Sequence, residues 1–511
     1  MTRVLYNAPL SSFWTETAKV LSNEHGFEPV FWMGVSSDGV LPKGCIYYDA
    51  WNAFRLQSPP DLGEGVDTEN AFAAIRDWEE YPIHFRTYLR ILNRVEVDGS
   101  FPLLEREPFF ARQLRWWINV VKRLKPDLYL AENVPHCPND YPLYMCLKFF
   151  GVKTLSVRST PLRGWYYLCE NITDADPLMI APRSEVSTED LNALEEEAVK
   201  RVLERFKTGN PPFYLRKHYK TQGNWRLWLR KQPRLGPLLD LLSLVKAAWQ
   251  SARGRPAPAG RWSLMKRPGS DYSKQSLNYF QVVSLTLKAR NIKIALKREL
   301  DAVSSPYQDD HPYYFYPLHY QPEQTTVPLG YDFCDQLSLV HCLAENLPEG
   351  RVLVVKEHPC QFMESLYGHQ GRCAGFYREL AGVKGVHLAN LESDTHELIA
   401  GSKGVISLTG TAAWEGLVLG KPAMIFGQAW YSSCPGVIRV RQWSEIESAM
   451  AKMESSHCEE SLMPFLKEFS RRAFRNNIFG RPDVDSDGVV PRSYQDFASQ
   501  LFHQSGYAGS P

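Results

Sequence analysis

The sequence predicts an α/β protein of two domains, each built on a parallel sheet flanked by helices. Short apolar runs alternate with helical segments in two parts of the chain, residues 3–157 and residues 313–426. Such alternation is typical of sheets in which each strand is followed by a helix. The length of 511 residues also exceeds what one hydrophobic core usually supports, which favours two domains over one.

Composition agrees with an ordinary globular protein, because hydrophobic residues make up 44% of the chain and charged residues 23%. The net charge of +1 gives no general attraction to nucleic acid. The ten cysteines are scattered, without CxxC pairs or zinc-finger spacing, which indicates free thiols in a reducing compartment. The N-terminus has no signal-peptide pattern, and no window approaches about 18 uninterrupted apolar residues. We therefore expect a cytoplasmic protein.

The first domain is expected over residues 1–180. A β-prone run at 3–7 precedes a helical segment at 11–25, which Ser11 or Ser12 would cap at its N-terminus. This opening predicts a β-α-β unit with parallel strands. The other elements expected here are strands at 27–35, 128–131 and 152–157 and helices at 69–95, 109–124 and 140–150.

Polar side chains follow the strand at 128–131. Glu132, Asn133 and His136 come just past its carboxyl end, where α/β folds place their ligands. A carboxylate and an imidazole at this edge are candidates for acceptor binding or acid–base catalysis, although each residue would equally suit a helix cap or a loop. We take Glu132 as the first candidate for the catalytic residue, with His136 and Asp140 as further candidates.

Residues 181–304 are expected to form a helical, basic insertion and linker. Between Phe213 and Arg267 the chain carries 13 Lys and Arg residues but only one acidic residue, Asp240, with four Trp residues interleaved. A basic segment that carries Trp suits the surface of an anionic membrane. The alternative is a solvated insertion between domains, and we do not expect nucleic acid as a partner.

The second domain is expected over residues 305–460, with two further helices in 461–511. A helix at 274–301 would lead into it. The expected strands are 313–318, 351–356, 386–388, 405–408 and 423–426, the expected helices are 332–346, 393–400 and 412–419, and the helices of the tail are FLKEFSRRAF and SYQDFASQLF.

The stretch 404–431, GVISLTGTAAWEGLVLGKPAMIFGQAWY, predicts a strand, a tight turn, a helix and a second strand. Such a turn aims backbone N–H groups and the positive end of a helix dipole at one point, which suits a phosphate. Thr409 and Thr411 would add hydroxyl groups beside it. Glu415 lies one helical turn beyond Thr411 on the same face, from where its carboxylate would reach a ribose. The alternative is a plain βαβ unit whose small residues only permit close packing.

Three loops of the second domain should meet at one edge of its sheet, because strands 313–318, 351–356 and 405–408 would lie side by side. Pro359 would restrict the backbone of His358 in one of these loops. An amide, cations, an imidazole and hydroxyl groups at one rim predict a nucleotide site. The side chains concerned are Gln321, Glu323, Lys356, Glu357, His358, Ser407, Thr409, Gly410 and Thr411.

Several common cofactor and metal patterns are absent from the sequence. No GxGxxG follows the first strand and no GxxxxGK[ST] occurs, which argues against a simple dehydrogenase and a P-loop enzyme. No DxD-like pair follows a strand. We therefore expect neither a cofactor nor a metal.

Three segments resemble the capsular-polysaccharide-biosynthesis family of GT-B glycosyltransferases, which includes bacterial transferases of Kdo (3-deoxy-D-manno-octulosonic acid). They are FYPLHYQPEQTT (315–326), VVKEHP (354–359) and SLTGTAAWEGLVLGKPAMIFGQAWY (407–431). The resemblance implies two Rossmann-like domains that face a cleft, with the residues of 461–511 packed back on the first domain. It also implies a catalytic carboxylate in the N-terminal half. The nucleotide-binding residues expected from the resemblance and from the loops are Gln321, Lys356, His358, Pro359, Ser407, Thr409, Gly410, Thr411 and Glu415, with Pro322 shaping the pocket.

The function expected from these patterns is transfer of a sugar from a nucleotide donor, such as CMP-Kdo or another CMP-sugar. The acceptor would be a surface polysaccharide or a lipid-linked glycan, and residues 213–267 would hold the enzyme at the inner membrane surface. Two alternatives remain. One is a UDP-sugar transferase or 2-epimerase of the same fold, and the other is a non-catalytic protein that binds or exports polysaccharide.

Overall fold

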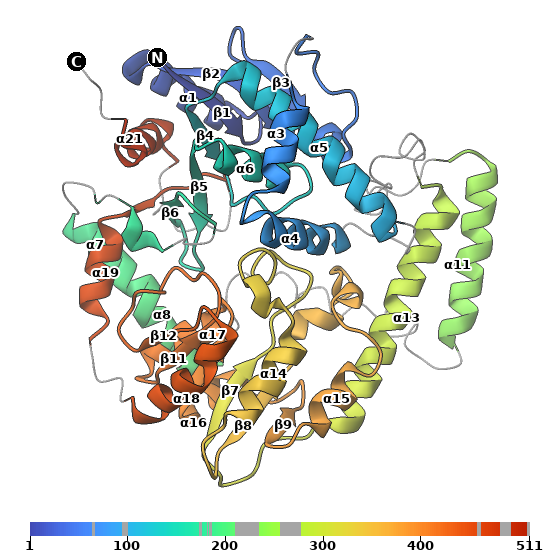
Figure 1. The fold of residues 1–511 in the computed structure, drawn as a ribbon. Helices are drawn as coiled ribbons and strands as arrows, with labels where there is room; N and C mark the ends of the chain where they lie inside the picture. The colour runs from blue at the N-terminus through green and yellow to red at the C-terminus, as the bar shows by residue number, and fades with distance from the viewer. Residues whose placement is uncertain are drawn as a thin grey trace.

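The computed structural model of the protein contains two sheets with helices on both faces (Figure 1). This confirms the predicted α/β class with two Rossmann-like domains. The order of the strands is β13-β6-β5-β4-β1-β2-β3 in the first sheet and β12-β11-β10-β7-β8-β9 in the second. The structure describes residues 1–63, 67–94, 101–172, 176–180, 182, 187–209, 235–255, 277–456, 461–480 and 492–507.

The first sheet is parallel over β1 to β5 and ends in two antiparallel strands. The prediction of a parallel sheet for this domain is therefore correct for β1 to β5 but not for β6 and β13. Strands β3 and β6 were not predicted, because they are short and follow turns instead of long helices. The strands are β1 (Thr2–Asn7), β2 (Phe27–Gly34), β3 (Ile46–Asp49), β4 (Leu128–Ala131), β5 (Lys153–Ser159), β6 (Trp165–Cys169) and β13 (Ala473–Arg475).

Alternating side chains of the first sheet enter two apolar cores, because successive residues of a strand point to opposite faces. Val4 and Tyr6 pack with the helices α1 (Ser12–His25) and α21 (Tyr494–Ser505). Leu5 belongs to the core on the other face. The helices that contribute to that core are α3 (Glu69–Arg76), α4 (Tyr81–Asn93), α5 (Leu103–Leu124) and α6 (Asp140–Phe149).

Two helix predictions need correction. The helix expected at 69–95 is two helices, because Pro82 lies in the first turn of α4, a position that proline tolerates at a helix start but not inside a helix. The tail segment FLKEFSRRAF is helical only as α19 (Met463–Ser470). Its last residues belong to β13, which pairs with β6 at the edge of the first sheet.

The second sheet is parallel throughout, and β7 lies between β10 and β8 as predicted. Its two faces are covered by separate groups of helices. The helices α13 (Tyr279–Val303), α14 (Gln336–Glu345), α15 (Phe376–Gly382) and α18 (Ile446–Ser455) lie on one face, and α16 (Thr395–Gly401) and α17 (Thr411–Val418) on the other. The strands are β7 (Tyr313–Pro317), β8 (Val352–Lys356), β9 (Val386–Ala389), β10 (Gly404–Ser407), β11 (Ala423–Ile425) and β12 (Val437–Arg439).

A long helical segment links the two domains. It consists of α7 (Thr188–Glu195), a π-helical turn (Glu196–Lys200) and α8 (Arg201–Thr208). The indole Nε1 of Trp414 on α17 donates to the carbonyl of Ala198 at 2.7 Å. Because a π-helical turn loosens the regular hydrogen-bond ladder, the Ala198 carbonyl is available to this indole.

The helix α11 (Leu235–Ala252) pairs with α13 at the margin of the molecule (Figure 1). It is part of the stretch 213–267 for which we expected membrane contact. Of that stretch, residues 213–234 and 256–267 lie outside the described residues. None of the helices in the described ranges is long and apolar enough to cross a bilayer.

The Phe497→Ala variant tests the contribution of α21 to the first domain. Phe497 is fully buried, with its ring centroid 5.6 Å from that of Phe13 and 5.2 Å from that of Trp14. Its truncation should lower the free energy of unfolding by about 3–5 kcal/mol, because loss of the buried ring leaves a cavity in the core. Urea denaturation measures this loss. The matched control Leu104→Ala removes a side chain from an exposed position and should change the stability by less than about 0.5 kcal/mol.

Candidate functional site

A cavity of about 680 Å³ lies where the two domains meet. The first domain contributes Asn133, which follows β4, and residues 158–161 at the end of β5. The second domain contributes the loops that follow β7, β8, β9 and β10. The carboxyl ends of both sheets therefore form the walls of one cleft, as a doubly wound fold requires.

The structure brings most of the predicted nucleotide-binding residues into this cavity. Gln321 is the exception, since its side-chain amide donates to the carbonyl of Cys334 at 2.9 Å and its oxygen accepts from Arg372. Gln321 therefore stabilises the loop after β7 through contacts outside the cavity. The predicted residues that line the cavity are Lys356, His358, Pro359, Ser407, Thr409, Gly410, Thr411 and Glu415.

The turn between β10 and α17 is held by its own hydrogen bonds. The N–H of Gly410 donates to Ser407 Oγ at 2.9 Å, and Thr409 Oγ1 donates to the carbonyl of Thr325 at 3.1 Å. A Cβ at Gly410 would lie 2.9 Å from Ser407 Oγ and 3.0 Å from His319 Nε2, so a larger residue here would displace these two side chains. The positive end of the α17 dipole opens on the cavity beyond this turn, beside Thr411.

His319 fixes this turn and was not among the predicted site residues. Its Nε2 accepts the N–H of Thr409 at 3.2 Å and lies 3.4 Å from Ser407 Oγ. Burial, followed by the charges of His358 and Arg372, lowers the pKa of His319 to about 3, so the imidazole is neutral and carries its proton on Nδ1. Its place directly after the strand at 313–318 was the signal that would have identified it.

Lys356 and His358 line the cavity at the end of β8. Lys356 is the buried last residue of β8, and burial lowers its pKa. Burial, then the charges of Lys356 and Arg372, lowers the pKa of His358 to about 4. His358 Nδ1 accepts the N–H of Cys360 at 3.1 Å, which leaves a proton on Nε2. The backbone of His358 is extended before Pro359, as predicted.

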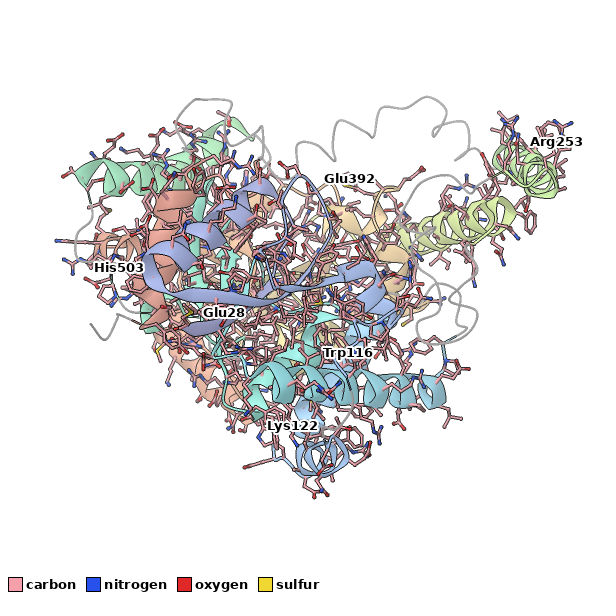
Figure 2. The ribbon with its side chains drawn as sticks, turned by 90° about the horizontal axis from the view of Figure 1, so that it is seen from above. Glu28, Trp116, Lys122, Arg253, Glu392 and His503 are labelled. Carbon is pink, nitrogen blue, oxygen red and sulfur yellow. The ribbon has the colours of Figure 1, made fainter. Side chains whose placement is uncertain are left out.

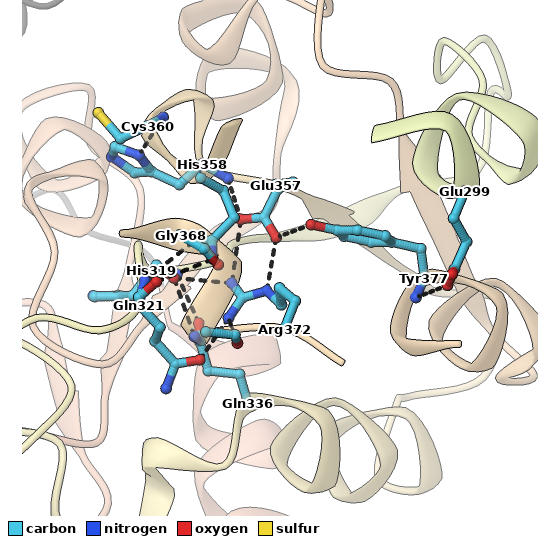
Figure 3. Close-up of polar contacts among 12 residues, drawn as sticks. Glu299, His319, Gln321, Gln336, Glu357, His358, Cys360, Gly368, Arg372 and Tyr377 are labelled. Carbon is cyan, nitrogen blue, oxygen red and sulfur yellow. Dashed lines mark hydrogen bonds and ion pairs between the residues drawn. The ribbon is translucent and has the colours of Figure 1, made fainter. Parts of the chain in front are cut away.

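A buried ion pair connects the loop after β7 with the loop after β8 (Figure 3). The guanidinium of Arg372 donates to the carboxylate of Glu357 through Nε at 2.8 Å and Nη2 at 3.2 Å. The same Nη2 donates to the carbonyl of His319 at 3.0 Å, and Tyr377 OH donates to Glu357 at 2.7 Å. Neither side chain of the ion pair is exposed to solvent. Arg372 thus joins the loop after β7 to the loop after β8.

Glu415 is partnered within the chain. One carboxylate oxygen accepts from Arg205 Nη2 of α8 at 3.0 Å, and the other lies 3.9 Å from His396 Nε2. Burial raises the pKa of Glu415, while the charge of Arg205 lowers it. Contact of Glu415 with a ribose stays a prediction, and a ribose would share the carboxylate with Arg205.

The predicted catalytic residues Glu132, His136 and Asp140 cluster behind Asn133 and do not line the cavity. Burial raises the pKa of Glu132 to about 7. Asp140 closes the turn before α6, since its Oδ1 accepts the N–H groups of His136 at 3.0 Å and Cys137 at 2.6 Å. His136 Nδ1 lies 2.6 Å from the carbonyl of Val134. Through these contacts Asp140 and His136 stabilise the turn, so Glu132 is the candidate for acid–base catalysis.

Ligand atoms of His136, Cys137 and Asp140 lie within 4.8 Å of one another, the spacing a metal ion needs. Asp140 Oδ1 already accepts two backbone N–H groups, so only its second oxygen would be available to an ion. The three residues also belong to one turn, and a turn of this kind explains their proximity without a metal.

Arg158, which was not among the predicted site residues, lines the cavity, and so does Glu323, which was predicted at the rim of the sheet but not among the nucleotide-binding residues. Arg158 Nη2 donates across the domain boundary to the carbonyl of Gln428 at 3.1 Å, and its buried Nη1 has no partner in the described structure. Burial raises the pKa of Glu323. The rule that identified Glu132 would have identified Arg158, because it directly follows the strand predicted at 152–157.

The Arg372→Met variant tests the buried ion pair. It leaves the Glu357 carboxylate buried without a cation, so the free energy of unfolding should fall by about 3–5 kcal/mol. Urea denaturation followed by tryptophan fluorescence measures the change.

The matched control for this prediction is Lys19→Met, which breaks the exposed ion pair with Glu16 and should cost less than about 1 kcal/mol. A double variant that also carries Glu357→Gln should recover part of the loss, since no charge stays buried. Equal stabilities of Arg372→Met and Lys19→Met would contradict the role given to the pair.

Comparison with known proteins finds a family match for part of the chain. Residues 264–462 match the family model described as capsule polysaccharide biosynthesis protein, and no curated protein matches the chain. Among solved structures, the chain is similar to the beta Kdo 2,4 transferase of Thermosulfurimonas dismutans KpsC, at 11% identity and a TM-score of 0.32 over 74% of this chain and 87% of that one. The beta Kdo 2,7 transferase of the same protein gives 10% identity and a TM-score of 0.30 over 79% and 96%. UDP-GlcNAc 2-epimerase from Methanocaldococcus jannaschii gives 10% identity and a TM-score of 0.24 over 90% and 95%. The match over residues 264–462 confirms the predicted resemblance to the capsule polysaccharide biosynthesis family.

Proposed function

We propose that the protein is a glycosyltransferase that moves a sugar from a nucleotide donor to a surface polysaccharide or a lipid-linked glycan. The observation that carries the proposal is the convergence of three loops of the second domain on one cavity between the domains. Lys356 and the start of α17 offer a phosphate a cation and the positive end of a helix dipole together. The family match over 264–462 supports the same function.

The donor proposed is a CMP-sugar, with CMP-Kdo as the first candidate. Kdo is a sugar acid, so its CMP derivative carries a carboxylate besides the phosphate. The cavity holds one cation on each wall, Lys356 from the second domain and Arg158 from the first. The guanidinium of Arg158 suits a carboxylate, because planar groups of this kind pair through two hydrogen bonds.

In the reaction proposed, the bond between the anomeric carbon and the phosphate oxygen breaks and CMP leaves with the electron pair. Lys356 and the turn at 409–411 stabilise the negative charge that develops on the phosphate. The Nε2–H of His358 donates to the nucleotide. The acceptor hydroxyl oxygen bonds to the anomeric carbon, and its proton passes to a carboxylate of the first domain. Glu132 is the carboxylate proposed; it follows β4 directly, next to Asn133, which lines the cavity.

Contact with an anionic membrane surface is proposed for the cytoplasmic enzyme, because a lipid-linked acceptor is held there. This part of the proposal concerns residues 213–267 and is independent of the donor.

Nucleotide binding tests the donor site directly. Isothermal calorimetry with CMP, UDP and GDP should show the tightest binding for CMP. Lys356→Met should weaken CMP binding by about 10- to 100-fold, because a charged hydrogen bond to the phosphate is lost.

The matched control is Lys403→Met, a lysine exposed at the opposite end of the sheet beside β10, which should bind CMP like the parent protein. Preference for UDP over CMP would overturn the cytidine assignment. Absence of binding to all three nucleotides would overturn the glycosyltransferase proposal itself.

The pH dependence of turnover tests Glu132. A general base must be deprotonated, and burial raises the pKa of Glu132 to about 7. The value of kcat/KM should therefore fall about tenfold per pH unit below that pKa and level off above it. Glu132→Gln should lower kcat by about 10²- to 10⁴-fold and keep CMP binding. Glu170→Gln, which changes a half-exposed carboxylate of the same domain, should leave both unchanged. An unaltered pH profile in Glu132→Gln would exclude Glu132 as the base.

A further inference from the structure

The helix α11 presents a row of large apolar side chains to solvent. Leu238 is 54% exposed, Leu241 58%, Leu242 57%, Val245 61% and Trp249 49%. Their spacing places them on one face, because residues three, four, seven and eleven positions apart lie along one side of a helix. A continuous apolar face of this size on a soluble protein marks a surface that binds something.

The opposite face of α11 packs on α13. Ala247 and Gln250 are buried there, and Asp240 forms an ion pair with Arg290 of α13 in which both side chains are largely buried. Asp240 is the one acidic residue of α11. The exposed face of the helix therefore carries no negative charge.

The apolar face is accessible to a large flat surface. Figure 1 shows α11 outermost on its side of the molecule, with α13 between it and the second sheet. Figure 2, turned by 90°, places Arg253 at the end of this helix, again at the margin. Neither view places another described element over the exposed side of α11.

Basic residues lie on α11 and just after its C-terminal end. Lys246 is exposed on α11, and Arg253 and Arg255 follow it, with the guanidinium of Arg253 3.8 Å from the ring centroid of Trp249. From residue 213 to residue 267 the sequence contains 13 basic residues and one acidic residue. Apolar side chains beside cations suit an anionic bilayer, in which the former enter the acyl boundary and the latter meet phosphates. A second copy of this chain is a poor occupant, because two such basic segments would repel each other.

We propose that α11 is a membrane-docking helix that lies in the interface of an anionic lipid bilayer, with Leu241, Leu242 and Val245 at its centre. Membrane contact was expected through basic residues, whereas this proposal places apolar side chains of α11 in the bilayer with basic residues beside them. The proposal does not depend on the identity of the donor. The helix α13, on which α11 packs, also contacts the segment that follows β8, since Lys293 Nζ donates to the carbonyls of Met363 at 2.8 Å and of Glu364 at 3.2 Å.

Vesicle co-sedimentation of the full chain tests the proposal. The protein should bind vesicles that contain phosphatidylglycerol and should bind phosphatidylcholine vesicles much more weakly. The double variant Leu241→Glu and Leu242→Glu should lower the partition coefficient on anionic vesicles by at least about tenfold, because it removes buried apolar area and adds negative charge. Lys246→Glu should lower it by roughly fivefold or more.

The matched control is Leu103→Glu with Leu104→Glu, which changes two exposed apolar residues at the start of α5 and should bind vesicles like the parent. All variants should bind CMP equally, so a failure here is separate from a failure of the donor site. Equal vesicle binding of the α11 double variant and the parent would overturn the proposal. So would a parent dimer in light scattering that the α11 variant converts to monomer, since a second copy would then cover the face.

Discussion

The buried ion pair of Arg372 with Glu357 is the contact on which the second-domain side of the cleft depends. One guanidinium bonds the carboxylate that follows β8 and the carbonyl of His319 that follows β7. A charge removed from water costs several kcal/mol unless a partner satisfies it. The two loops therefore cannot separate without exposing or orphaning a charge, and the positions of His319 and His358 follow from this restraint.

The same burial decides the chemistry of the two imidazoles. Both pKa values lie far below the ordinary value for histidine, so each ring is neutral, and the nitrogen that accepts a backbone N–H fixes its tautomer. His319 acts inward on the turn at 409–411, whereas His358 holds a proton on its Nε2. The positive charge of the described part of the cavity comes from Lys356 and Arg158 instead.

The sequence predicted what depends on strand order and missed what depends on distant contacts. Strands β7, β8 and β10 are apolar and short, so their adjacency and the meeting of their loops followed from the rules of parallel sheets. Arg372 lies 15 residues after Glu357 in the chain in a segment without regular pattern, and no local signal marks it as the partner. Arg205 reaches Glu415 over 210 residues. The end of the tail helix was mispredicted because the edge of a remote sheet, at β6, stabilises β13.

An apolar core spans both domains, and this bears on how far the cleft can open. Trp414 and Trp430 of the second domain lie with ring centroids 4.5 Å apart, and Trp430 is 5.1 Å from Phe469 of α19. The chain continues from α19 into β13 of the first sheet. Aromatic groups of this size contribute much of the stability of a core, so the C-terminal segment ties both walls of the cavity to one packed unit. Opening the cleft widely would expose these rings to water. This apolar core therefore opposes separation of the domains.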